Sequence, residues 1–339
     1  MHKRLLNECL IDLKITTEGP LLIKSGMHSD DGIDMTPVVT FCRGTAEEPY
    51  IPGSSFKGTL RSHAERIART LSLEESKWQM GACDPFGAAA QLKSGDWERA
   101  NSAACSAKLQ LRKGAEERFT TAQVYKDSCP ICKVWGNTFL MGRLAVSDCY
   151  LAEGSGSTRE QRNQVAIDRQ TGAVAGGPFN MYVITGATFE TRLKLQNFEL
   201  WQLGLLAFVL RDLGEGLVPL GMGKSRGLGQ VKSQVRQMRI YSVNNRLPSQ
   251  DYSRLFGIYV MEEETDRQAY GYWEGEKEGV EFPGALAELD DLGIRREFLV
   301  EDDALIPLWK EVAKLANQRL SEYEIPETMR HEKLAGLVR

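Results

Sequence analysis

The chain has 339 residues, 42% of them hydrophobic, enough for one large or two ordinary domains with a buried core. It contains no run near the roughly 20 apolar residues of a membrane-spanning helix, and its opening residues lack the apolar stretch of a secretory signal, so a soluble, cytoplasmic protein is expected. The formal net charge of −4 argues, over the chain as a whole, against a nucleic-acid partner.

The first predicted element is a strand over residues 11–15, where apolar and polar side chains alternate. A polar stretch rich in Gly and Asp follows at residues 25–34. Apolar residues then recur every three or four positions from Ser55 to Leu71, which predicts a helix. Ser54 or Ser55 is positioned to cap that helix.

Four further elements are predicted downstream: strands over Arg143–Leu151 and Thr188–Leu195, a helix over Phe198–Leu213 and a strand over Gly229–Val235. The resulting β-α-β-β-α-β order predicts an α+β, ferredoxin-like (RRM-like) fold, an antiparallel four-stranded sheet with both helices on one face. Inserts of roughly 70 and 35 residues interrupt it, and loops of that length are functional or carry structure of their own.

The composition changes near residue 238. Between Glu262 and Asp303 there are 15 acidic and 4 basic residues, a local balance of −11, so the remainder of the chain carries +7. A basic surface for a nucleic acid is therefore available outside that segment. Residues 308–320 predict an amphipathic helix. We expect a first domain over residues 1–237 and an acidic C-terminal extension over residues 238–339, to which the sequence assigns no chemistry.

A glycine-rich motif, GMGKSRGLG, occupies Gly221–Gly229. Glycines let the backbone turn tightly and approach a ligand, and two cations lie among them, so a phosphate backbone is the expected ligand. The motif follows a helix and precedes a strand, which excludes the dinucleotide fingerprint; a plain turn remains the alternative. The residues expected to contact RNA are Gly223, Lys224, Ser225, Arg226 and Gly227.

A second motif, IPGSSFKGTLR at residues 51–61, opens the first predicted helix. The backbone N–H groups of a helix N-terminus, together with Ser54, Ser55 and Lys57, suit phosphate oxygens. Arg61 lies one turn beyond Lys57, so both side chains can face the same RNA strand. The alternative is an ordinary capped helix with solvated cations.

Cysteine spacing predicts a structural zinc site. The chain has seven cysteines, and Cys129 and Cys132 form a CxxC pair, which in a cytosolic protein points to metal or redox chemistry. A closed zinc site needs four ligands, which Cys83 and Cys105 in the same long insert would complete, with His63 as the rival fourth ligand. Zinc would supply folding energy to an insert with few apolar runs. The remaining cysteines, expected to be ordinary buried residues, are Cys9, Cys42 and Cys149.

These motifs, with IDRQTG at residues 167–172, occur in an order that resembles the RAMP superfamily, specifically the backbone subunits of CRISPR type III effectors, over about residues 8–235. The resemblance implies a subunit that polymerises along crRNA, beside other effector subunits, and grips RNA through the glycine-rich loop and the helix N-terminus. It also implies a zinc-binding insertion at about 72–140. The guide sequence itself would not be read.

The resemblance further implies a thumb-like β-hairpin at about residues 152–188, which kinks the duplex of guide and target RNA. Phe179 and Met181 are the expected apolar wedge, since inserted apolar side chains unstack bases. Arg169 would contact RNA, with Asp168 as its structural neighbour. The alternative is a surface hairpin whose apolar face packs down.

The resemblance also implies metal-dependent cleavage of target RNA by an aspartate after the first strand. Gly-Ile-Asp at residues 32–34 is similar to the family's motif. Asp34 is the expected catalytic residue, with Mg²⁺ or Mn²⁺ as the possible ion. Two residues rather than one separate it from the next proline, which leaves Asp30 and Asp31 as rivals, and His28 is a weak candidate base. The alternative is an RNA-binding structural subunit without nuclease activity. The sequence contains no HExxH motif, which argues against a zinc-dependent hydrolase.

Overall fold

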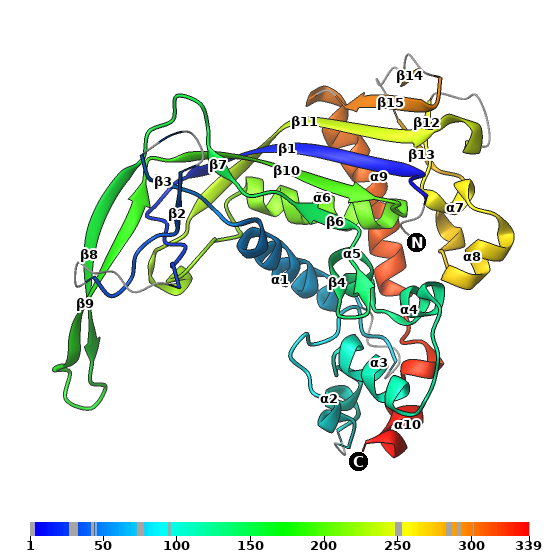
Figure 1. Ribbon diagram of the computed structural model, residues 1–339, viewed down its shortest axis with the longest axis horizontal. Helices are drawn as coiled ribbons and strands as arrows, with labels where there is room; N and C mark the ends of the chain where they lie inside the picture. The colour runs from blue at the N-terminus through cyan, green and yellow to red at the C-terminus, as the bar shows by residue number, and fades with distance from the viewer. Residues whose placement is uncertain are drawn as a thin grey trace.

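The computed structural model describes residues 4–26, 33–41, 44, 46–72, 78–93, 96–247, 253–282, 287–289, 293–300 and 302–338. The fold is a mixed α+β arrangement (Figure 1) with one large antiparallel sheet, helices under it, a small-helix insertion below, and a long hairpin projecting from one end. Among the described residues, no helix has both the length and the apolarity to cross a bilayer.

The large sheet has seven strands, with β1 near its centre. Side chains of β1 alternate strictly between buried and half-buried positions, and the inward Ile11, Leu13 and Ile15 are at most 1% exposed, as the alternation predicted. The strand order is β14-β15-β11-β1-β10-β6, and β7 pairs with β10. The strands are β1 (Asn7–Thr17), β6 (Leu144–Val146), β7 (Tyr150–Leu151), β10 (Thr188–Gln196), β11 (Val231–Val243), β14 (Ala287–Leu289) and β15 (Arg295–Val300).

Three long helices accompany the sheet: α1 (Gly53–Leu71), α6 (Leu200–Gly214) and α9 (Asp302–Ser321). Helices α1 and α6 lie beneath the sheet, and α9 runs beside α6 (Figure 1). The buried stripe of α1 recurs every four residues from Phe56 through Leu60 to Ala64. Gly204 allows α6 to approach α9 closely, because a Cβ there would lie 2.0 Å from the Val312 carbonyl oxygen.

Three sequence-based boundaries differ from the structure. The strand expected over Arg143–Leu151 is split into β6 and β7, because the backbone of Cys149, between them, bonds Ile51 instead of β10. The last expected strand continues to Val243, and its second half pairs with β15. The sheet therefore runs without a break across the boundary expected at residue 238. The predicted serine cap of α1 is absent: the N-cap is Pro52, whose side chain makes no capping bond.

The insertion between α1 and β6 is a set of short helices rather than a loop. It comprises a 3₁₀ helix (Ala89–Lys93), α2 (Trp97–Asn101), α3 (Cys105–Gly114), α4 (Thr121–Asp127), α5 (Pro130–Trp135), β4 (Gly136–Asn137) and β5 (Leu140–Met141). The smaller peripheral elements are β2 (Val39–Thr40), β3 (Glu48–Pro49), β12 (Arg254–Leu255), α7 (Ile258–Met261), α8 (Glu264–Tyr270), β13 (Val280–Glu281) and α10 (His331–Leu334).

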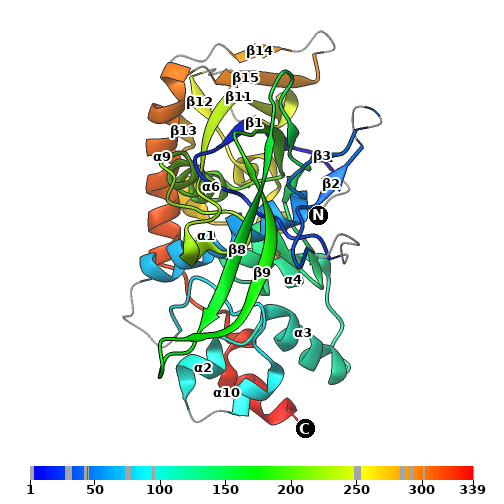
Figure 2. The ribbon, with the colours of Figure 1, turned by 90° about the vertical axis from the view of Figure 1, so that its left-hand side faces the viewer.

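The projecting hairpin consists of β8 (Thr158–Ile167) and β9 (Val174–Thr185). Figure 2, in which it faces the viewer, shows the two strands twisting around each other. They pair with each other as a two-stranded sheet, and most of their side chains are exposed. Towards its base, β9 also forms single bridges with Leu21 and Met35. The hairpin is thus an arm held by its base rather than a layer of the core.

Candidate metal centre and nucleic-acid interface

Four buried thiols, those of Cys83, Cys105, Cys129 and Cys132, lie within 4.8 Å of one another. Cys83 Sγ is 3.7 Å from both Cys129 Sγ and Cys132 Sγ. Zinc–sulfur bonds of about 2.3 Å in a tetrahedron place sulfurs about 3.8 Å apart, whereas a disulfide needs about 2.05 Å. The donor set therefore fits a single metal ion such as zinc and confirms that the four predicted cysteines come together.

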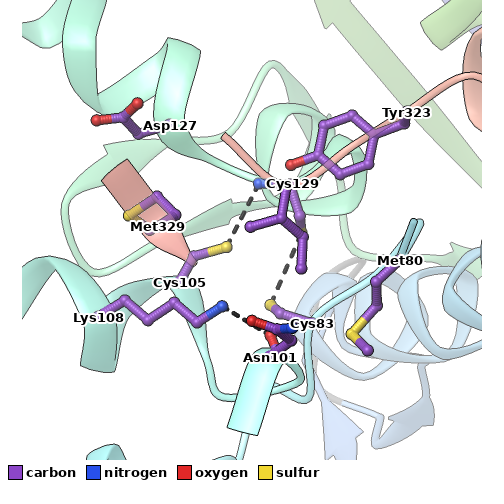
Figure 3. A pocket seen from close by; sticks show the side chains of 10 residues that line it. Met80, Cys83, Asn101, Cys105, Lys108, Asp127, Cys129, Tyr323 and Met329 are labelled. Carbon is purple, nitrogen blue, oxygen red and sulfur yellow. Dashed lines mark hydrogen bonds between the residues drawn. The ribbon is translucent and has the colours of Figure 1, made fainter. Parts of the chain in front are cut away.

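Helix α5 supplies two of these thiols and orients them. Cys129 is its N-cap, and the Cys132 backbone N–H donates to Cys129 Sγ at 3.4 Å. The Cys129 N–H in turn donates to Cys105 Sγ at 3.3 Å (Figure 3). Hydrogen bonds from the neighbouring thiols hold the pKa of Cys129 well below its usual range, while hydrogen bonding to Cys129 and burial raise the pKa of Cys105.

His63, the rival ligand, lies outside this cluster of four. Its Nε2 is 2.7 Å from Asp212 Oδ2 on α6, and Arg66 Nη2 donates to its Nδ1 at 2.7 Å. Both ring nitrogens are thus engaged, Nε2 in joining α1 to α6 and Nδ1 in a contact within α1. The thiol set is completed by Cys105 rather than His63.

Two of the remaining cysteines are fully buried, as expected. Burial raises the pKa of the Cys149 thiol to about 12 and also raises that of Cys9. Neither belongs to the metal-binding cluster. Cys42 lies outside the described residues, as do His28, Asp30 and Asp31.

The glycine-rich loop presents one 3₁₀ turn, Lys224–Arg226, between two left-handed glycines. Gly223 has a φ of 74° and Gly227 a φ of 78°, a conformation that favours glycine. The three turn residues are exposed. Burial of its stem, with Arg66 nearby, lowers the pKa of Lys224. The turn therefore offers two cations and its backbone to a ligand outside.

Three separate motifs meet at the middle of the hairpin. Arg226 Nη1 donates to Gln164 Oε1 of β8 at 2.6 Å, and Gln164 is the cross-strand neighbour of Phe179. One residue further along β9, the Asn180 backbone N–H donates to Asp34 Oδ2 at 2.8 Å. The expected catalytic carboxylate, the expected wedge and the glycine-rich loop are thus brought to one stretch of the hairpin.

The two residues of the expected wedge lie in different surroundings. Phe179 is 43% exposed, whereas Met181 is only 1% exposed. Met181 packs with Leu22, Val183 and Leu228 in a small cluster at the base of the hairpin. Of the two, only Phe179 is exposed enough to be inserted between bases.

The hairpin's tip carries the IDRQTG motif. Asp168 Oδ1 accepts hydrogen bonds from the backbone N–H groups of Gln170 at 3.0 Å and Thr171 at 2.7 Å, and these bonds lower the pKa of Asp168. Asp168 shapes the turn, as expected of a structural residue, and Arg169 is exposed beside it.

The N-terminus of α1 is capped from a distant part of the chain. The Gly53 N–H donates to Asp148 Oδ1 at 2.6 Å, and Asp148 follows β6. Ser54 and Ser55 remain exposed, while burial and the nearby Arg61 lower the pKa of Lys57. Asp148 escaped sequence reasoning because nothing local relates it to a helix 95 residues earlier.

Arg61 points away from the surface on which it was expected. Its guanidinium donates to Glu65 Oε1 at 2.9 Å, to the Gly136 carbonyl oxygen at 3.0 Å and to Cys132 Sγ at 3.7 Å. The side chain therefore reaches the thiol cluster, an orientation that helical spacing alone cannot distinguish from an outward one.

A comparison with curated proteins finds no match to the chain. The model of the RAMP superfamily matches residues 14–232, more than half of the chain. The match begins within β1, ends at the start of β11, and includes the insertion, the hairpin and the glycine-rich loop. The chain belongs to the RAMP superfamily, which is associated with CRISPR RNA-binding proteins.

Proposed function

We propose that this protein is a backbone subunit of a type III CRISPR effector complex, which binds crRNA, shapes its duplex with target RNA and cuts that target with Asp34. The convergence of Asp34, Phe179 and Arg226 on one stretch of the hairpin carries the proposal. Neighbouring copies and other effector subunits are its partners.

A ferredoxin-like core is part of this proposal. Four strands lie in the antiparallel order β11-β1-β10-β6, with α1 and α6 against the sheet. This order is the one that a split βαβ unit produces. It supports an RNA-binding domain that bears an inserted metal-binding module, a hairpin thumb and a C-terminal part that extends the sheet.

Two exposed groups of residues would hold the RNA backbone. The turn of the glycine-rich loop provides Lys224, Ser225 and Arg226, and the first turn of α1 provides Ser54 and Ser55. Cations and hydroxyls of this kind bind phosphates without reading sequence. Lys57 joins the second group, and Arg169 adds a cation at the hairpin tip. The loop glycines bring the backbone close to the strand.

Phe179 would act on bases rather than on phosphates. It is exposed on β9, next to Asn180, whose backbone N–H binds Asp34. An aromatic ring offers a face on which any base can stack. A kink made there would expose one phosphodiester of the target beside the Asp34 carboxylate.

The Asp34 side chain is exposed and held in place through Oδ2. A single carboxylate suits Mg²⁺ or Mn²⁺ that takes its other ligands from RNA phosphates and water, and such an ion would neutralise charge at the scissile phosphate. Alternatively, the carboxylate accepts a proton from the 2′-hydroxyl. In both cases its negative charge is required, while the thiol-bound zinc is structural.

The test is cleavage by assembled complexes containing Asp34→Ala or Asp34→Asn. We expect both variants to bind crRNA normally and to cut target at this subunit's position at least about 100-fold more slowly. Asp12→Ala is the control, because Asp12 is a half-buried aspartate of β1 paired with Arg192. Cleavage at the wild-type rate by both Asp34 variants would refute the catalytic assignment.

One observation favours a second function, an RNA-binding subunit without nuclease activity. The Asp34 and Met35 backbone N–H groups both donate to the Asn180 carbonyl oxygen, at 3.1 and 3.2 Å, and the carboxylate accepts from the same residue. Asp34 thus anchors the hairpin. Asn keeps an acceptor oxygen and loses the charge. No cleavage at this subunit's position by the wild-type complex, together with normal assembly by Asp34→Asn and defective assembly by Asp34→Ala, would favour this structural role.

A further inference from the structure

The side chain of Arg61 joins α1 to the thiol cluster. Arg61 lies one turn beyond Lys57 on α1, yet its Nη2 donates to Cys132 Sγ at 3.7 Å and its Nη1 to the Gly136 carbonyl oxygen at 3.0 Å. Both acceptors belong to the metal-binding insertion. A helix whose first turn faces outward is thus attached, at its third turn, to the thiol cluster.

The contact between Arg61 and the thiol cluster is stabilised by opposite charges. Zinc with four thiolates carries a net charge of −2, and a buried net charge is costly unless opposite charges compensate it. Arg61 supplies a cation on the Cys132 side. Lys108, only 3% exposed, lies among the residues that surround the thiols and donates to the Asn101 carbonyl oxygen at 2.7 Å (Figure 3). The local acid, Glu65, is shared between Arg61 and Arg69, with nitrogen–oxygen distances of 2.9 and 3.8 Å.

The same helix is fixed on another side by a contact without metal. His63, two residues after Arg61, bonds Asp212 of α6 through Nε2, and Asp212 also accepts from Arg211. The α6 contact fixes the position of α1 against the domain core. Arg61 fixes its position against the insertion.

We propose that Arg61 is a positioning residue that couples metal binding to RNA binding. Its guanidinium stabilises the Cys132 thiolate of the loaded site and thereby holds the N-terminal part of α1, which carries Ser55 and Lys57. The RNA half of this inference rests on the proposed function, whereas the metal half does not. Arg61 acts through the thiol cluster rather than by touching a phosphate.

The experiment measures zinc release from the full-length, zinc-loaded protein to a chromophoric chelator, and binding of a crRNA-length single-stranded RNA over a range of salt concentrations. We expect Arg61→Gln to release zinc at least about tenfold faster than wild type, the size of effect seen when a group supporting a metal ligand is removed. Its RNA affinity should fall with little change in salt slope. Arg61→Lys keeps the charge but loses the several N–H donors of the guanidinium. Its rate of zinc release should lie between those of wild type and Arg61→Gln.

Lys57→Gln is the matched control, four residues earlier on the same helix. It should release zinc at the wild-type rate, bind RNA more weakly and lose about 0.7 from the salt slope, as expected for one phosphate contact. Zinc release at the wild-type rate by Arg61→Gln would overturn the proposal. So would a reduced salt slope with normal release, since Arg61 would then be a phosphate ligand.

Failure of the proposed function gives a different result. If Arg61→Gln and Arg61→Lys accelerate zinc release while neither they nor Lys57→Gln alter RNA binding, then α1 is not an RNA site. The metal half of the inference then stands, and the coupling to RNA is overturned.

Discussion

Lys224 and Arg226 owe their exposure to two neighbouring glycines that pack tightly. Gly221 and Gly229 have φ angles of 74° and 85°. A Cβ on Gly221 would lie 2.3 Å from the Leu22 carbonyl oxygen, and one on Gly229 would lie 2.0 Å from that of Leu220. Backbone packing at the loop's ends therefore holds its cationic centre outward. The loop is therefore both a structural turn, through its glycines, and a candidate phosphate site, through its cations.

Substituting these cations tests the phosphate site. We expect Lys224→Ala and Arg226→Ala each to weaken binding of single-stranded RNA at every sequence and to lower the salt slope by about 0.7, as expected when one phosphate contact is lost. Lys314→Ala is the control, because that lysine is exposed on α9 and paired with Glu311. Titrations at several salt concentrations measure the slope, and equal slopes for all four proteins would contradict the assignment.

At the scale of elements, two acidic side chains, Glu199 and Glu276, lie close together at the N-terminus of α6. Glu199 forms a capping box with Gln202 and accepts from the Tyr125 hydroxyl at 2.5 Å. Glu276, only 1% exposed, comes from the C-terminal part of the chain. Burial and the nearby Glu199 raise the pKa of Glu276 well above its ordinary 4.5. A second acid, one that resists ionisation, therefore lies buried beside Glu199.

This arrangement predicts that Glu276→Gln stabilises the protein at neutral pH. A carboxyl with a raised folded-state pKa contributes its stability below pH 4.5 and loses it as pH rises through the folded-state pKa. The variant's advantage in free energy of unfolding should therefore grow between pH 5 and 8, by at most about 1.4 kcal/mol per pH unit. Urea unfolding measures it. Glu274→Gln, an exposed acid in the same turn paired with Lys277, should show no such trend.

At the scale of the whole molecule, the C-terminal segment returns to the insertion and encloses the thiol cluster. Tyr323 and Met329 line the space beside the thiols (Figure 3). The Ile325 N–H donates to the Trp78 carbonyl oxygen at 2.8 Å, and Thr328 Oγ1 donates to Asp127 Oδ1 at 3.0 Å. The insertion is thus held between α1 and the end of the chain.

Metal removal should therefore loosen two distant segments together. After chelation, we expect amide hydrogen exchange to accelerate at least about tenfold in residues 78–140 and 322–338, because metal binding supplies folding energy to them. Peptides from β1 and β10 should keep their protection and serve as the internal control. Cys83→Ala should reproduce the effect, and Cys149→Ala, outside the cluster, should not. Uniform loss of protection would contradict this division.

Sequence patterns predicted those features that depend on neighbouring residues in the chain. The alternation at Ile11, Leu13 and Ile15 predicted β1, and the CxxC pair pointed to the thiol cluster. Contacts between distant residues were out of reach: Asp148 caps α1 from 95 residues away, and the direction of Arg61 depends on where α5 packs. The continuation of β11 past residue 238 depends on its pairing with β15. No local pattern in the sequence shows that these two segments pair.

The central position of β1 has a consequence for synthesis on the ribosome. Both neighbours of β1 in the sheet come late: β10 begins at residue 188 and β11 at residue 231. At 5–20 residues per second, β1 waits roughly 10–40 s for its second partner. During that interval its apolar side chains and unpaired backbone are exposed, a condition that favours aggregation. We expect chaperones to bind this strand in the nascent chain.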